Sequence, residues 1–160
     1  MPRYNWEPLN RQQIGAYAEY FVKMELTMHG FEVYSSEVDD RGVDFVARLD
    51  PGSFIAIQVK SLRGSGYVFM HKRKFNPLDE YLYLALALFF EGKPPELYLV
   101  PSSVWGAPKG IFVSRDYKGE DQTSEPEWGL NISRKNMPEL EPFRFANRVE
   151  KLKTNAKPTD

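Results

Sequence analysis

The chain has 160 residues, 42% hydrophobic and 27% charged, which is the composition of one ordinary globular domain with a real core. Its formal net charge is −1, from 21 basic and 22 acidic residues, which excludes a broad electrostatic attraction to nucleic acid and leaves only a local basic patch for such binding. The absence of cysteine excludes disulfides, thiol catalysis and cysteine-ligated zinc, and the presence of only two histidines disfavours a histidine-rich zinc site.

Targeting signals are not predicted. The N-terminus has no basic segment followed by an apolar region, so we expect no signal peptide. The longest apolar run, residues 81–90, is far shorter than the roughly 20 residues that a membrane helix requires. A chain without cysteine also fits a reducing compartment. We therefore expect a cytoplasmic protein with no membrane partner.

The first 29 residues predict an arm followed by a helix. Residues 1–10 are polar and aromatic with two prolines, which is typical of an irregular arm. Residues 11–29 predict a helix, and Gly30 follows as its C-terminal glycine. The apolar positions of this helix recur at helical spacing on one face: Ile14, Ala18, Phe21, Val22 and Leu26.

Three strands are expected next, at residues 31–34, 43–49 and 54–61. Residues 35–42 form a polar, acid-rich turn between the first two. Residues 50–53, with the sequence Asp-Pro-Gly-Ser, are typical of a hairpin between the second and the third. The two strands around this turn should therefore be antiparallel neighbours.

The middle of the chain combines basic and apolar segments. Residues 67–70 predict a short strand, and residues 71–74 form a basic cluster. The near-continuous apolar run at residues 81–90 is typical of a strand buried on both faces. Residues 97–100 predict a further strand.

The C-terminal part predicts shorter elements. A short helix with a serine N-cap is expected at residues 102–105, and strands at 111–113 and 128–133. Residues 118–127 predict a mobile polar loop. Residues 138–153 predict a helix that is interrupted or entered at its second proline.

This order of elements predicts an α/β fold with a mixed central sheet flanked by helices. We expect residues 1–160 to form one domain, with a core at about 11–100 and a C-terminal extension at about 101–155.

The most informative residues for function are Asp44, Gln58 and Lys60. Residues two apart on a strand point to the same side, so Gln58 and Lys60 should share one face while Ile57 and Val59 point to the other. The hairpin brings Asp44 near the Gln58 end. An acid inside an apolar strand needs a partner, which a plain ion pair with Lys60 would supply.

A metal site is the alternative to that ion pair. Carboxylate and amide oxygens are ligands that Mg²⁺ prefers. A metal ion there would polarise a phosphate and lower the pKa of a bound water, while Lys60 would orient that water or neutralise developing charge. Glu19, on the predicted helix, would add a second carboxylate, directly or through water, unless it is simply a solvated helix residue.

Together these residues resemble the PD-(D/E)XK nuclease superfamily, in its resolvase-like and intron-endonuclease-like branches. The resemblance covers residues 12–60 well and extends more weakly to residue 90. It implies a restriction-endonuclease-like core, with Glu19 as the helix acid, Asp44 as a metal-binding acid and Lys60 as the catalytic lysine. Gln58 stands where the family has an acid, so it keeps an oxygen ligand but removes a negative charge. The Val59 carbonyl would be a further metal ligand.

The resemblance implies a Mg²⁺- or Mn²⁺-dependent endonuclease that acts on DNA, with a homodimer supplying one site for each strand. A basic patch next to the site would contact phosphates, unless it is only a solvated loop: Arg63, His71, Lys72, Arg73 and Lys74. The alternative is a catalytically inactive protein of the same fold that binds nucleic acid or a protein partner, which the neutral Gln58 favours.

Overall fold

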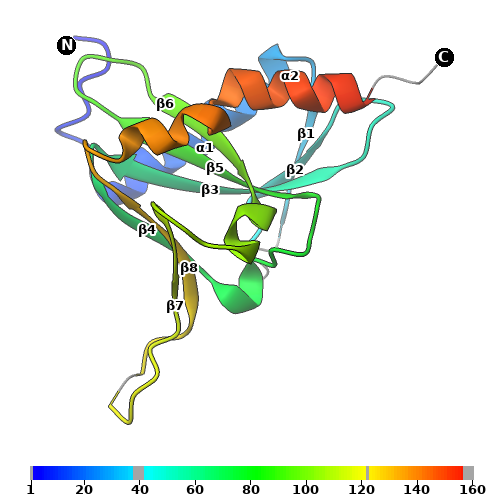
Figure 1. The fold of residues 1–160 in the computed structure, drawn as a ribbon. Coiled ribbons are helices and arrows are strands. Elements are labelled where there is room, and N and C mark those ends of the chain that lie inside the picture. Colours follow the sequence, from blue (N-terminus) through cyan, green and yellow to red (C-terminus); the bar gives the residue numbers. More distant parts are fainter. Residues whose placement is uncertain (1, 38–41, 122, 157–160) are drawn as a thin grey trace.

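A five-stranded mixed sheet forms the centre of the computed structural model, which describes residues 2–37, 42–121 and 123–156. In spatial order its strands are β1 (Glu32–Ser35), β2 (Phe45–Arg48), β3 (Ile55–Arg63), β5 (Leu82–Phe89) and β6 (Glu96–Pro101). The first three strands form an antiparallel meander, β5 runs parallel to β3, and β6 runs antiparallel to β5. The predicted α/β fold with a mixed central sheet is therefore confirmed, including the hairpin between β2 and β3 (Figure 1).

A second sheet of three strands was not expected from the sequence. Its order is β4 (Gly66–His71), β8 (Glu127–Ile132) and β7 (Phe112–Arg115), all antiparallel. It combines one strand from the expected core with two from the expected C-terminal extension. The connection between the parallel strands β3 and β5 contains β4 and the short 3₁₀ helix η1 (Lys72–Lys74) in place of an α-helix.

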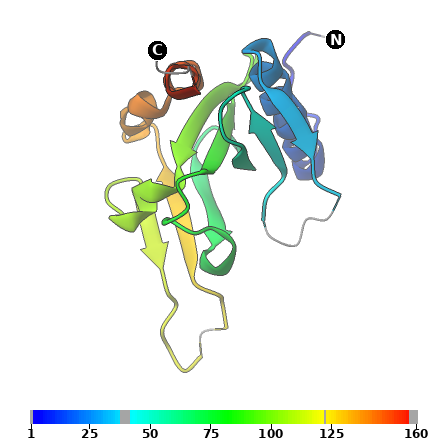
Figure 2. The same ribbon diagram turned by 90° about the vertical axis from the view of Figure 1, so that its right-hand side faces the viewer.

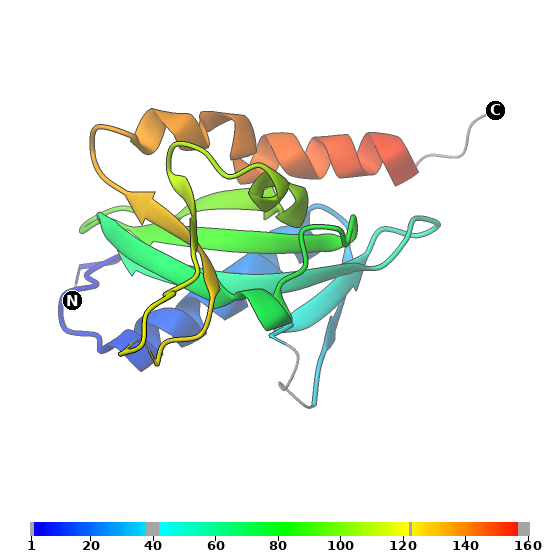
Figure 3. The same cartoon turned by 60° about the horizontal axis from the view of Figure 1, so that its bottom comes forward.

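The helices α1 (Arg11–Met28) and α2 (Phe145–Ala156) share an apolar cluster with one face of the central sheet. The side chain of Asn10 caps α1 through a reciprocal pair of hydrogen bonds with Gln13. Gly30, at φ +92°, ends α1 as the sequence predicted. The second sheet lies on the side of the central sheet away from α1 (Figure 2), and α2 packs against β6 (Figure 3).

Side chains alternate between the two faces of the central strands, and each face packs into its own apolar cluster. Ile55 and Ile57 belong to the cluster that contains the α1 residues, whereas Leu84 and Leu86 belong to the cluster that contains the second sheet. β5 is almost completely buried on both faces, as the apolar run predicted. The face of β3 that carries Gln58 and Lys60 is therefore the one directed away from α1.

Two details of the C-terminal part differ from expectation. Ser102 is not an N-cap: it begins the 3₁₀ helix η2 (Ser102–Gly106), and its hydroxyl donates to the Asp79 carbonyl at 2.8 Å. The helix expected at 138–153 is divided into η3 (Met137–Phe143), which contains Pro142, and α2, because proline cannot donate the hydrogen bond that an α-helix requires.

None of the described helices is both long enough and apolar enough to cross a membrane.

Gly129 provides a test of how the second sheet is packed. A Cβ atom there would collide with the ring of Tyr67, so we expect Gly129→Ala to lower the free energy of unfolding by about 1–3 kcal/mol. In a Tyr67→Ala background the same change should be neutral or stabilising by up to about 1 kcal/mol, because alanine loses less backbone entropy than glycine. Urea denaturation of the four proteins measures this coupling. An equal loss of unfolding free energy in both backgrounds would show that Tyr67 does not pack closely against Gly129.

Candidate functional site

Asp44 stands where the β2–β3 ladder ends. Its backbone N–H donates to the Ile57 carbonyl at 2.9 Å, and its carboxylate Oδ2 accepts the Val59 N–H at 2.6 Å. The carboxylate thus takes the place of the main-chain acceptor that a longer β2 would offer. Because the N–H and the C=O of a strand residue point to the same side of the strand, the Val59 carbonyl is directed to this same edge.

Gln58 carries a buried oxygen that lacks a partner. Its Oε1 has no hydrogen-bond donor among the residues that the structure describes. A buried acceptor left unpaired costs roughly 1–3 kcal/mol, so native proteins retain few of them. The β2–β3 register ends at the pair Phe45–Ile57, and the next residue on each side of that pair, Asp44 and Gln58, lines the same cavity. A hard cation between these oxygen donors would satisfy the orphaned acceptor, so the donor set fits a divalent metal ion.

A cavity of about 300 Å³ joins these groups to others. The cavity is bounded by the start of β2, the middle of β3, the end of β4 and η1. Its lining residues are Gly42, Asp44, Gln58, Val59, Lys60, Phe69, Met70, His71 and Lys74. The sequence-predicted residues Asp44, Gln58, Val59 and Lys60 are therefore brought together, with His71 and Lys74 on the wall.

Gly42 allows the chain to approach η1 closely at this cavity. Its φ is +75°, and a Cβ atom there would lie 3.1 Å from the Cβ of Lys74. A left-handed backbone next to a close neighbour favours glycine. The backbone conformation of Gly42 therefore helps to position Asp44, two residues later, at the cavity.

Glu19 is not among the residues that line the cavity. On α1 its carboxylate pairs with Lys23 Nζ at 3.0 Å, and that same ammonium donates to Ser35 at 3.2 Å. Among the described residues that line the cavity, Asp44 supplies the single carboxylate. No group of three or more His, Asp or Glu residues within the described ranges is arranged to hold a metal ion.

The residues of the predicted basic patch lie in three different places. His71 and Lys74 line the cavity, and His71 Nδ1 lies 3.2 Å from a Glu125 carboxylate oxygen, an ion pair when the imidazole is protonated. Arg63, at the far end of β3, donates to the backbone carbonyls of Glu7 and Leu9 in the N-terminal arm. Arg63 therefore lines a neighbouring groove instead of the cavity.

Lys72 and Arg73 hold the segments around the β7–β8 connection. Lys72 donates to Ser114 at 2.6 Å and to Asp116 at 2.7 Å, and this bond lowers the pKa of Asp116 below its ordinary value. Arg73 pairs with Glu125 at 3.1 Å and likewise lowers the pKa of that carboxyl group. These two cations already have anionic partners, which weakens the expectation that they contact phosphates.

Sequence reasoning missed Phe69 and Gly42 as residues of the site. Phe69 is 41% exposed, and its ring centroid lies 5.9 Å from Lys60 Nζ. The available signal was the alternation of β4, in which Val68 and Met70 are buried and Phe69 between them is not.

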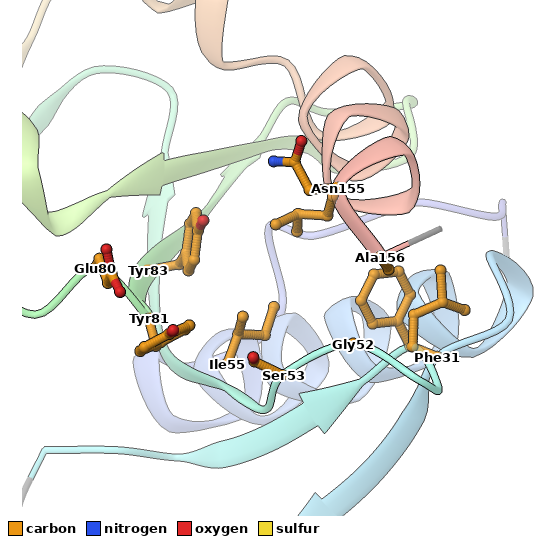
Figure 4. A pocket seen from close by; sticks show the side chains of 11 residues that line it. Phe31, Gly52, Ser53, Ile55, Glu80, Tyr81, Tyr83, Asn155 and Ala156 are labelled. Carbon is orange, nitrogen blue, oxygen red and sulfur yellow. The ribbon is translucent and has the colours of Figure 1, made fainter. Parts of the chain in front are cut away.

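A separate pocket of about 270 Å³ lies near the opposite end of the β2–β3 hairpin (Figure 4). Phe31, Ile55 and Tyr83 line it, beside Ala156 at the end of α2. Burial raises the pKa of Tyr83 above its ordinary value. None of the residues predicted to act in chemistry or in DNA binding lines this pocket.

No protein-family model matches the chain, and none of the curated proteins matches it in sequence. The solved structures that are similar to the chain include two nucleases. One is Hjc, a Holliday junction resolvase from the archaeon Archaeoglobus fulgidus, with a TM-score of 0.54 and 16% identity over 85% of this chain and 95% of that chain. The other is the bacterial homing endonuclease I-Ssp6803I, with a TM-score of 0.53 and 16% identity over 91% of this chain and 96% of that chain.

These likenesses confirm the predicted fold: the chain has a restriction-endonuclease-like α/β core with a mixed central sheet. At 16% identity they establish the fold alone.

The orphaned oxygen of Gln58 makes the site testable without any substrate. We expect Gln58→Met to raise the free energy of unfolding by about 1 kcal/mol in buffer with EDTA, because an unpaired buried acceptor is removed and the side-chain size is kept. Urea denaturation measures the change, with the exposed Gln12→Met as the matched control. A loss of about 1 kcal/mol or more would show that the oxygen has a partner.

Proposed function

We propose that this protein is a divalent-metal-dependent endonuclease that hydrolyses phosphodiester bonds in DNA. One observation carries the proposal: the buried Oε1 of Gln58, which has no hydrogen-bond partner in the described part of the chain, belongs to a side chain that lines the same cavity as Asp44 and Lys60. The fold shared with two DNA-processing nucleases, a resolvase and a homing endonuclease, supports it.

Asp44, the Gln58 amide oxygen and the Val59 carbonyl would hold Mg²⁺ or Mn²⁺, since all three are hard oxygen donors. When bound, the metal ion would supply Lewis acidity to the scissile phosphate. With Gln58 in place of a carboxylate, the metal affinity should be modest. Glu19 would add a second carboxylate only after leaving its ion pair with Lys23.

The protein's own side chains would assist the hydrolysis of the phosphodiester bond. Water attacks the phosphorus atom in line, one P–O ester bond breaks, and the departing oxygen takes up a proton. Lys60 would neutralise the charge that develops on the phosphate, or orient the attacking water. His71 and Lys74, on the cavity wall, would contact the flanking DNA backbone. Because each chain contributes one such site, a homodimer would allow both strands to be cut.

A second candidate is a catalytically inactive protein of this fold that binds nucleic acid. The observation that favours it is that Asp44 supplies the single carboxylate among the described residues of the cavity wall, since one charge and two neutral oxygens bind a metal ion weakly.

Cleavage assays separate the two candidates. We expect the wild type to cut supercoiled plasmid or branched DNA in Mg²⁺ or Mn²⁺, and Asp44→Asn and Lys60→Met to lower the rate at least about 100-fold. Lys109→Met, at an exposed lysine outside the cavity, is the matched control and should retain the wild-type rate. Circular dichroism checks that each variant is folded. Absence of cleavage by the wild type in either metal would favour the inactive binding protein.

The neutral amide at position 58 gives a gain-of-function test. Gln58→Glu restores a second carboxylate to the donor set, so we expect the Mn²⁺ concentration for half-maximal cleavage to fall roughly tenfold. Titration of the cleavage rate with Mn²⁺ measures this concentration in both proteins. An unchanged or higher concentration would show that residue 58 does not contribute a metal ligand.

A further inference from the structure

A groove of about 720 Å³ extends from the candidate site along β3 to the start of α1. It shares Val59, Lys60 and Phe69 with the smaller cavity, so the two are continuous. Its other lining residues come from the start of α1, from β3 and from β4: Leu9, Asn10, Arg11, Ile14, Gly15, Ser61, Leu62, Arg63, Tyr67 and Val68. Its volume lies in the range that accommodates nucleotide-sized ligands.

The groove is electropositive. Its lining residues, as far as the structure describes the chain, include the cations Arg11, Lys60 and Arg63 but no carboxylate. Arg11 and Arg63 have no carboxylate partner among the described residues. The positive end of the α1 dipole adds to this charge, since α1 has no acidic residue in its first turn. A polyanion is the complementary ligand.

One wall of the groove is aromatic. The rings of Tyr67 and Phe69, two residues apart on β4, are stacked with centroids 6.2 Å apart and an interplanar angle of 18°. Tyr67 is held in place, because its hydroxyl donates to the buried Glu127 carboxylate. Burial, followed by that hydrogen bond, raises the pKa of Tyr67 above its ordinary value, so it stays a neutral donor. Phe69 remains 41% exposed next to Lys60.

We propose that this groove binds an unpaired DNA strand beside the scissile phosphate, so that the substrate carries a single-stranded segment. The phosphates follow the row of Arg11, Lys60 and Arg63, and a base stacks on Phe69. A base within a duplex has both faces covered by its neighbours, so only an unpaired base can use such an aromatic surface. The position of the scissile phosphate rests on the proposed function, whereas strand binding by the groove does not.

Substitution of Gly15 tests whether the positive charge of the groove contributes to DNA binding. It lines the groove, and a Cβ atom built there meets no other atom within 4 Å. Gly15→Glu therefore introduces a carboxylate into the groove without a steric clash, and Gly15→Gln introduces a side chain of the same size without the charge. Both should be accommodated in α1, since glycine is the poorer helix former.

The test is binding of a fluorescent oligothymidylate of about 16 nucleotides, compared with a duplex of equal length, by anisotropy in EDTA. We expect the single strand to bind at least about tenfold more tightly than the duplex. Phe69→Leu should weaken single-strand binding roughly tenfold and change duplex binding by less than about twofold. Gly15→Glu should weaken single-strand binding more than Gly15→Gln does. Circular dichroism confirms that the variants are folded.

Because these titrations exclude metal, they separate this inference from the proposed nuclease. If single-strand binding depends on Phe69 but no metal ion supports cleavage, the inference of strand binding by the groove stands and the proposed nuclease activity is contradicted. If the protein cleaves DNA but binds duplex as tightly as single strand, the proposed nuclease activity stands and the inference about the groove is overturned. The same conclusion follows if Phe69→Leu leaves single-strand binding unchanged. Failure to bind either DNA would also overturn the inference about the groove.

Discussion

The hydrogen bond from the Val59 N–H to the Asp44 carboxylate is the interaction on which the site depends. It ends the main-chain pairing of β2 with β3 and substitutes a side chain for the next backbone acceptor. A charge-assisted bond of this kind is stronger than a neutral one, so the carboxylate is held firmly at the strand edge. The Asp44 carboxylate held in this way lines the same cavity as the amide of Gln58.

β3 combines structural and chemical roles through the two-residue period of a strand. Ile55 and Ile57 pack into the apolar cluster beneath α1, while Gln58 and Lys60 face the cavity on the other side. The packing of the apolar face holds β3 in the sheet, so the residues of the polar face are positioned without an apolar core of their own. The second sheet then supplies what β3 lacks on that face, namely the aromatic wall of Phe69.

Local patterns in the sequence predicted much of this arrangement. The face of α1, the hairpin at residues 50–53 and the buried strand β5 follow from spacing within short windows, and so does the approach of Asp44 to Gln58. The pairing of β4 with β8 was not predictable in this way, because Tyr67 and Asn131 are distant in sequence and nothing local identifies such a partner. The ion pairs of Lys72 and Arg73 were missed for the same reason.

The central claim is that Asp44 and Gln58 form a divalent metal site, and direct metal binding tests it without reference to catalysis. Electron paramagnetic resonance of free Mn²⁺ during a protein titration measures that binding. The account predicts one bound ion per chain for the wild type, loss of binding for Asp44→Asn, and retention for the matched exposed variant Asp121→Asn. Equal binding by the wild type and Asp44→Asn, or no binding by the wild type, would contradict the metal site.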